Sequence, residues 1–96
     1  MIIVDAHQDI AYNAMCFNRD YQIAALRKRQ LEAGSEIAQR AGGQATIGLS
    51  EAIVGRVAII FGTLFVAPYS KNTSPWDAVK YRDDKEAFTL AQQQLD

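Results

Sequence analysis

Residues 56–68, RVAIIFGTLFVAP, decide the fold because they contain the longest apolar stretch of the 96-residue chain. Val, Ile and Phe occupy both odd and even positions here, which is typical of a strand covered on both faces in a parallel sheet. Pro68 ends the pattern because proline has no N–H to donate to a neighbouring strand. The stretch therefore predicts a strand over about residues 56–66.

A second strand is expected at the start of the chain, where residues 1–10 read MIIVDAHQDI. Ile-Ile-Val followed by small and polar groups predicts a short buried strand over about residues 2–6. Successive side chains of a strand point to opposite faces, so Asp5, His7 and Asp9 share one face. Three ionisable groups directly beyond an apolar strand are costly to desolvate without a compensating partner, so a partner for them is expected.

The segment between the two strands, about residues 20–54, is predicted to be a helical excursion without a further strand. Asp20 is suited to cap a first helix, and Gly34 is suited to end it in the left-handed conformation. Residues 35–48 are expected to form a glycine-containing loop, in which a helical turn before Gly42 and Gly43 is left open. Ser50 is expected to cap a short helix that Gly55 closes.

The first of these helices carries a narrow apolar stripe and a basic run. Ile23, Leu26 and Leu31 are expected to form the buried stripe. The basic residues 27–29 are expected to lie on the solvated face rather than to bind a ligand.

The C-terminal segment predicts one long helix over about residues 75–95. Ser74 is suited to cap it, Pro75 fits the first helical position, and Asp77 lies in the first turn.

The predicted order of strand, helices, strand and helix belongs to the α/β class, with parallel strands. Two strands of this kind cannot cover their own apolar faces, and a (β/α)8 barrel takes about 250 residues. We therefore predict that residues 1–96 are one truncated α/β unit, namely the first two βα units of a TIM barrel.

Composition narrows the range of functions. The chain is 49% apolar and 22% charged, which is typical of a globular protein, and its net charge is −1 with both signs mixed along the chain. This balance predicts neither nucleic-acid binding nor a polybasic membrane anchor. The single cysteine, Cys16, excludes an internal disulfide and is read as a structural thiol of a reducing compartment. With no signal-peptide pattern and no apolar run of about 20 residues, a cytoplasmic location is expected.

His7 and Asp9 are the candidate metal ligands. They lie just beyond the first strand, and α/β barrels place functional groups at the C-terminal ends of their strands. An imidazole and a carboxylate two residues apart on a strand can reach one divalent metal, which would compensate the desolvation of Asp9. The spacing alone also fits a hydrogen-bonded core histidine with Asp9 capping a turn, so both interpretations stay open at this point.

Two stretches resemble one family. VDAHQDIAYN (residues 4–13) resembles the opening strand of the membrane (renal) dipeptidase family of zinc peptidases, in which an Asp-x-His-x-Asp stretch begins the barrel. IGLSEAIVGRVAIIFGTLFVAPY (residues 47–69) resembles that family's short helix, glycine and second strand ending at proline. The resemblance implies that His7 and Asp9 are ligands of one of two zinc ions. It implies that Asp5 supports these ligands or is structural, and it identifies no catalytic residue in this chain.

The resemblance also implies a function. The complete parent enzyme would cleave dipeptides or related small amides with a hydroxide bridged by two zinc ions. Tyr69, which follows the second strand, is a candidate for lining the substrate pocket. The remaining metal ligands of the family come from strands three to eight, so the 96 residues alone are expected to be inactive. The alternative is a truncated or remodelled non-enzymatic module that associates through its exposed sheet edge with a second copy or with the remainder of a barrel.

Overall fold

The chain is α/β. The computed structural model describes residues 1–96 and contains a parallel pair formed by β1 (Ile3–Gln8) and β2 (Val57–Gly62). Ile3 lies opposite Val57 in this pair. The prediction of two neighbouring parallel strands is confirmed. β2 ends at Gly62, whereas the strand was predicted to continue to about residue 66. It ends there because β1, its only strand neighbour, ends at Gln8.

Four helices lie between the two strands, and one of them was not predicted. The helices are α1 (Ile10–Phe17), α2 (Ala25–Glu32), α3 (Ile37–Arg40) and α4 (Leu49–Val54). α1, the unpredicted helix, follows β1 with only Asp9 between them, and it ends at Asn18 in the left-handed conformation with φ of 54°. Asparagine tolerates this conformation better than most residues, which gives α1 a definite end.

α2 begins at Ala25, four residues later than a cap at Asp20 would allow. The Asp20 carboxylate accepts a hydrogen bond from the Gln22 N–H (2.8 Å), and the Ile23 N–H bonds to the Asp20 carbonyl (3.2 Å). Asp20 therefore stabilises a turn that precedes the helix. The predicted left-handed glycine after the helix is present, since Gly34 has φ of 80°.

The buried face of α2 is not the predicted one. Leu26 and Leu31 are 65% and 57% exposed, whereas Ala25, Lys28 and Glu32 are buried. The prediction that Leu26 and Leu31 form a buried apolar stripe is therefore wrong. The prediction that the basic residues 27–29 all face solvent is wrong for Lys28. The physical reason is that the inner face of α2 meets Arg19 and Tyr21, which lie between α1 and α2, rather than an apolar sheet.

α4 begins at Leu49 after Gly48, so the predicted cap at Ser50 is wrong. A Cβ atom at position 48 would lie 2.6 Å from the Ile23 carbonyl oxygen, so glycine is required at this close approach. The Leu49 N–H donates to the Tyr21 carbonyl (2.8 Å). The start of α4 is thus fixed by the turn before α2, a contact that local capping rules do not describe.

The predicted helix over residues 75–95 is interrupted. It is replaced by a 3-10 turn, η1 (Asp77–Val79), then β4 (Lys80–Tyr81), then α5 (Asp84–Leu95). β4 pairs in parallel with β3 (Ala67–Pro68), and this pairing requires extended backbone where a continuous helix was expected.

A second capping signal explains where α5 begins. The Asp83 carboxylate accepts a hydrogen bond from the Glu86 N–H (2.8 Å), and the Glu86 carboxylate accepts one from the Arg82 N–H (2.7 Å). Asp83 therefore caps α5, and Glu86 reaches back one residue further than in a capping box, to the residue before the cap. The predicted cap at Ser74 does not begin a long helix but forms a turn, in which the Asp77 carboxylate accepts hydrogen bonds from the N–H and the hydroxyl of Ser74.

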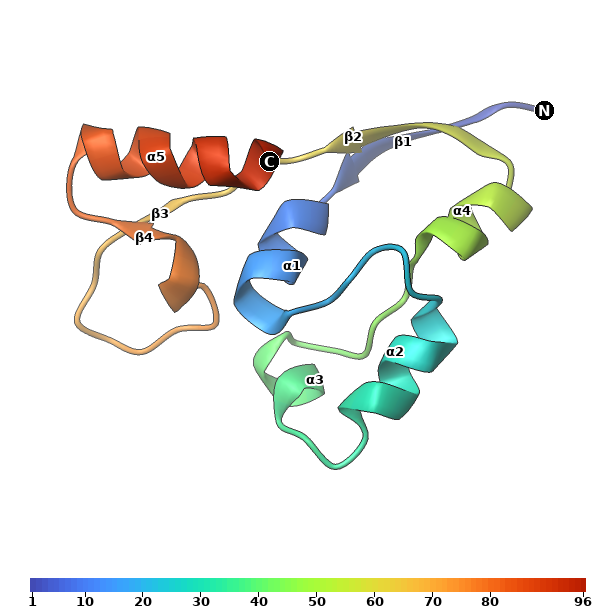
Figure 1. Cartoon of the computed structure of the whole chain (residues 1–96), viewed down its shortest axis with the longest axis horizontal. Coiled ribbons are helices and arrows are strands. Elements are labelled where there is room, and N and C mark those ends of the chain that lie inside the picture. Colours follow the sequence, from blue (N-terminus) through green and yellow to red (C-terminus); the bar gives the residue numbers. More distant parts are fainter.

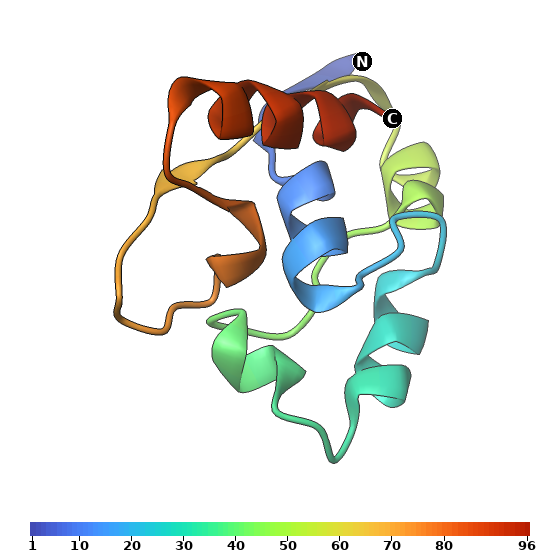
Figure 2. The same cartoon turned by 60° about the vertical axis from the view of Figure 1, so that its left-hand side comes forward.

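The elements form a flat, open arrangement. Figure 1 shows β1 and β2 at one end of the molecule, α2 and α3 at the far end, and α1 between them. The turned view in Figure 2 keeps α1 central, with α5 crossing on the side of the sheet. The extents are 43 × 33 × 18 Å, and the radius of gyration is 14.5 Å, against about 12.5 Å for a compact domain of this length.

The core is thin. Nine of the 96 residues are buried, and among the large side chains only Val79 is fully enclosed. The accessible surface is 6841 Å², whereas a compact protein of 10.6 kDa exposes about 5,500 Å². The excess includes apolar side chains of both long strands, so the chain leaves surface exposed that a closed α/β domain would bury.

Candidate functional site

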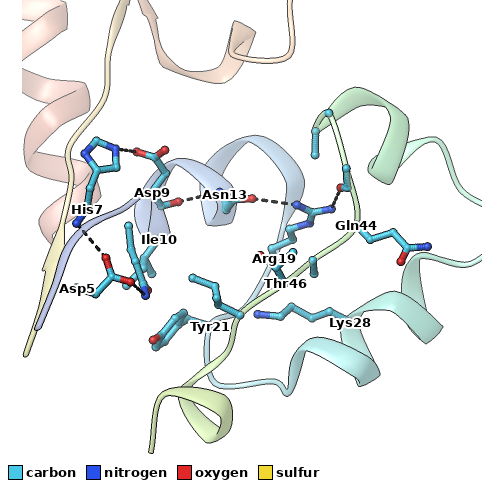
Figure 3. A pocket seen from close by; sticks show the side chains of 16 residues that line it. Asp5, His7, Asp9, Ile10, Asn13, Arg19, Tyr21, Lys28, Gln44 and Thr46 are labelled. Carbon is cyan, nitrogen blue, oxygen red and sulfur yellow. Dashed lines mark hydrogen bonds and ion pairs between the residues drawn. The ribbon is translucent and has the colours of Figure 1, made fainter. Parts of the chain in front are cut away.

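His7 and Asp9 lie side by side at the C-terminal end of β1. The Nε2 atom of His7 is 3.3 Å from Oδ1 of Asp9, as Figure 3 shows. The two side chains are 69% and 45% exposed. His7 is thus not enclosed in an apolar core, and the interpretation as a core histidine is wrong.

Asp5 is engaged in local hydrogen bonds. Its Oδ1 accepts from the backbone N–H of His7 (3.0 Å), and its Oδ2 accepts from the side-chain amide of Gln8 (2.7 Å). The bond from Gln8, followed by the bond from the His7 backbone, holds the pKa of Asp5 below its usual value. Asp5 therefore fixes the backbone that carries His7, while its two oxygens are both in use.

Thr63 completes the environment of Asp9 and was missed by sequence reasoning. Its hydroxyl donates to Oδ1 of Asp9, and its N–H donates to the Gln8 carbonyl (2.9 Å). Thr63 directly follows β2, so the parallel pairing brings it beside the residue that follows β1. The signal that could have found it is a hydroxyl side chain at the end of an apolar strand, in the same place where the first strand carries Asp9.

The pair of His7 and Asp9 fits two positions of a metal site. Two ligand atoms at about 2.0–2.1 Å from a tetrahedral zinc lie about 3.3–3.4 Å apart, which matches the observed separation. One imidazole nitrogen and one carboxylate oxygen are also donors that zinc accepts. No group of three or more His, Cys, Asp or Glu side chains in residues 1–96 is arranged to hold a metal ion. The residues present therefore fit zinc as part of a ligand set rather than as a whole one.

A hollow of about 520 Å³ adjoins the pair. Its wall comes from the end of β1, the start of α1, the turn before α2, α2 itself and the loop before α4 (Figure 3). The lining residues that bear charges or hydrogen-bonding side chains are Asp5, His7, Gln8, Asp9, Asn13, Arg19, Tyr21, Lys28, Gln44 and Thr46. This volume lies within the range of small-molecule sites, and the lining combines polar and apolar surface.

A buried ion pair holds one wall of the hollow. Arg19 and Glu32 form two parallel hydrogen bonds, Nε to Oε1 at 2.7 Å and Nη2 to Oε2 at 3.0 Å. Arg19 also donates to the Asn13 side chain (3.2 Å) and to the Gly43 carbonyl (2.8 Å). Since these partners belong to α1, α2 and the loop, Arg19 joins the three segments that surround the hollow.

Lys28 and Tyr21 form another part of the wall. Lys28 is only 6% exposed, and its ammonium lies 5.8 Å from the centre of the Tyr21 ring. Burial lowers the pKa of Lys28 and raises the pKa of Tyr21. The Tyr21 hydroxyl and the Gln8 Oε1 atom are buried without a hydrogen-bond partner. Buried polar atoms in proteins are ordinarily paired, so these two atoms mark an incomplete polar site.

The structure does not bring Tyr69 to this hollow. Its side chain is 50% exposed, and the Arg82 guanidinium lies 4.5 Å from the centre of its ring. Tyr69 lines a separate recess together with Lys80 and residues 70–73. Its role in a substrate pocket stays a prediction.

Comparison with models of known protein families, with curated proteins and with solved structures finds no match in any of the three. Among the helices, none combines the length and the apolar character that crossing a membrane requires. The function therefore has to be argued from the site, which offers an exposed imidazole–carboxylate pair beside a polar hollow.

Proposed function

We propose that this chain is the N-terminal part of a zinc-dependent, dipeptidase-like metallohydrolase of the cytoplasm, in which His7 and Asp9 hold one of two zinc ions. The observation that carries the proposal is the 3.3 Å separation of His7 Nε2 and Asp9 Oδ1 at the C-terminal end of a parallel strand. The resemblance of residues 4–13 and 47–69 to membrane dipeptidases supports the same function.

Each residue near the pair has a role in this proposal. Asp5 fixes the His7 backbone through the hydrogen bond to its N–H, and Thr63 holds Oδ1 of Asp9. When bound, zinc would supply Lewis acidity and water activation for the hydrolysis of an amide bond. A dipeptide or small amide would enter the hollow beside His7 and Asp9.

The proposed parent fold is a (β/α)8 barrel whose first two βα units are these 96 residues. Functional groups of such barrels gather at the C-terminal ends of parallel strands, where His7, Asp9 and Thr63 lie. The thin core and the excess surface of about 1,400 Å² agree with a unit that further strands and helices would cover.

Zinc binding to the chain tests the proposal directly. We expect one weak site by competition with a chromophoric chelator, because two protein ligands leave most of the coordination shell to water. His7→Ala and Asp9→Asn should each abolish this site. Asp84→Asn, which removes an exposed carboxylate of α5, should leave it unchanged and serves as the matched control. Unchanged zinc binding in His7→Ala would remove the metal site from the proposal.

Catalysis provides the second test. We expect no hydrolysis of dipeptides by the 96 residues in excess zinc, because only part of one ligand set is present. Joining the chain to downstream strands of a barrel, in one chain or as a complementing fragment, should produce hydrolysis that depends on His7 and Asp9. Hydrolysis by the 96 residues alone, abolished by His7→Ala, would instead mean that a second copy completes the site.

The second candidate function is a non-enzymatic module that associates through the exposed edge of its sheet. It is favoured by the apolar side chains that the strands leave open, since Val4, Ile59 and Phe61 are 52%, 52% and 59% exposed. Sedimentation of the chain should then show self-association that Phe61→Asp abolishes, with zinc binding absent. A monomer that binds zinc would favour the metallohydrolase.

A further inference from the structure

α2 turns a polar side toward the hollow and an apolar side toward solvent. Lys28 and Glu32 are buried, whereas Leu26 and Leu31 are exposed. Places where a sequence breaks the ordinary amphipathic rule are often functional sites. Glu32 is accounted for by its ion pair with Arg19, so Lys28 is the residue that requires an explanation.

The Lys28 ammonium lacks an acidic partner, since no carboxylate oxygen lies within 4.0 Å of it. Glu51 lies near enough to raise the pKa of Lys28, but burial has the larger and opposite effect. The two oxygens of Glu51 accept hydrogen bonds from the Ala25 N–H (3.1 Å) and the Ser50 hydroxyl (3.1 Å). The stem of Lys28 is buried, whereas its ammonium is not one of the enclosed polar atoms and lines the hollow. An anionic ligand in the hollow would therefore supply the counter-charge that the ammonium lacks.

Two residues that line the same hollow carry unpaired, enclosed polar atoms. Gln8, which is 9% exposed, has an unpaired Oε1 atom, and the Tyr21 hydroxyl is also unpaired. Figure 3 shows Lys28 reaching from α2 toward Tyr21, on the other side of the hollow from His7 and Asp9. A ligand in the hollow would therefore meet the Lys28 ammonium on one side and the imidazole–carboxylate pair on the other.

We propose that Lys28, whose ammonium lies beside the Tyr21 ring, binds the carboxylate group of a small ligand in this hollow. A singly charged carboxylate fits better than a phosphate, because Asp5 and Asp9 line the same space and would repel a dianion. Arg19, the other cation of the lining, is already neutralised by Glu32. The identification of this ligand as a dipeptide with a free carboxylate rests on the proposed function, whereas carboxylate binding by Lys28 does not.

The test compares two probes that differ in one charge. Glycylglycine and glycylglycinamide are titrated into the full chain in metal-free buffer and followed by NMR chemical shifts. Glycylglycine should bind about 10- to 100-fold more tightly than its amide, the range expected for a charge-assisted hydrogen bond. Lys28→Met should lose that preference, and Arg27→Met, on the exposed side of the same helix, should keep it. Tyr21→Phe keeps the ring beside the ammonium, and it should keep the preference because the hydroxyl that it removes is enclosed.

The outcomes separate this inference from the proposed function. Equal affinities for the two probes, or an unchanged preference in Lys28→Met, would overturn the carboxylate site. So would tighter binding of inorganic phosphate than of glycylglycine. If Lys28→Met loses its folded circular-dichroism spectrum, Lys28→Gln takes its place, and an unchanged preference for glycylglycine in Lys28→Gln overturns the site equally. Zinc binding is measured separately in Lys28→Met and should match that of the parent chain. If the parent chain shows no zinc binding that depends on His7, only the proposed metal centre is refuted, and the carboxylate site is not.

Discussion

The ion pair between Arg19 and Glu32 should be the most sensitive polar contact of the fold. Both side chains are about nine-tenths buried, at 9% and 8% exposure, and they share two hydrogen bonds. Glu32→Gln keeps the shape of the side chain and leaves the Arg19 charge buried without its counter-charge. Breaking one partner of a buried pair costs about 3–5 kcal/mol. A domain of this size has a free energy of unfolding of about 5–14 kcal/mol, so the loss would be a large share of it.

The assay is equilibrium unfolding in urea, followed by circular dichroism, for three variants. Glu32→Gln should lower the urea midpoint strongly. The double variant Arg19→Met with Glu32→Leu removes both charges together, and it should recover most of the loss because replacing a whole buried pair with apolar groups is often neutral or stabilising. Arg82→Met is the surface control, because the Arg82–Glu86 pair spans 3.7 Å with side chains 65% and 43% exposed. It should cost less than about 1 kcal/mol.

Two results would refute this reasoning. One is a Glu32→Gln chain whose urea midpoint shifts no more than that of the surface control. The other is a double variant that is no more stable than Glu32→Gln, because the destabilisation would then come from lost packing rather than from an unpaired buried charge.

Two further predictions concern α5 and Lys28. Asp83→Ala removes the acceptor of the Glu86 N–H and should cost about 1 kcal/mol in urea unfolding together with part of the helical circular-dichroism signal; an unchanged signal would mean that α5 does not depend on its cap. Burial lowers the pKa of Lys28 below its usual 10.5, so between the lowered folded value and 10.5 the unfolded chain binds more protons than the folded one. The contribution of Lys28 to the free energy of unfolding should therefore rise with pH through that window and be lost as pH falls. The difference in urea midpoint between Lys28→Met and the parent chain should narrow as pH approaches 10.5. A difference that does not change with pH would contradict the lowered pKa of Lys28.

Local sequence pattern determined the elements whose contacts are local or strongly apolar. Alternation along the first strand predicted that His7 and Asp9 share a face, and their facing atoms lie 3.3 Å apart. The apolar run after Arg56 predicted β2 and its parallel pairing with β1, because a strand apolar on both faces suits a parallel sheet. Gly34 likewise has the left-handed conformation expected just beyond a helix end. The face shared by His7 and Asp9, the extent of the apolar run and the glycine at the helix end are each encoded within a few residues, whereas the parallel pairing followed from the strand being apolar on both faces.

Only the tertiary structure decided which surfaces face one another. The pattern of α2 predicted an apolar stripe, but its neighbours in space are polar, so Lys28 faces inward and Leu26 outward. Thr63 reaches Asp9 across 54 positions of sequence, and no periodicity within either strand encodes that contact. The break between residues 75 and 84 arises in the same way, because β3 offers a pairing partner that the helical propensity of the segment cannot anticipate. Local pattern says which residues share a face, whereas the partner of that face is set by distant parts of the chain.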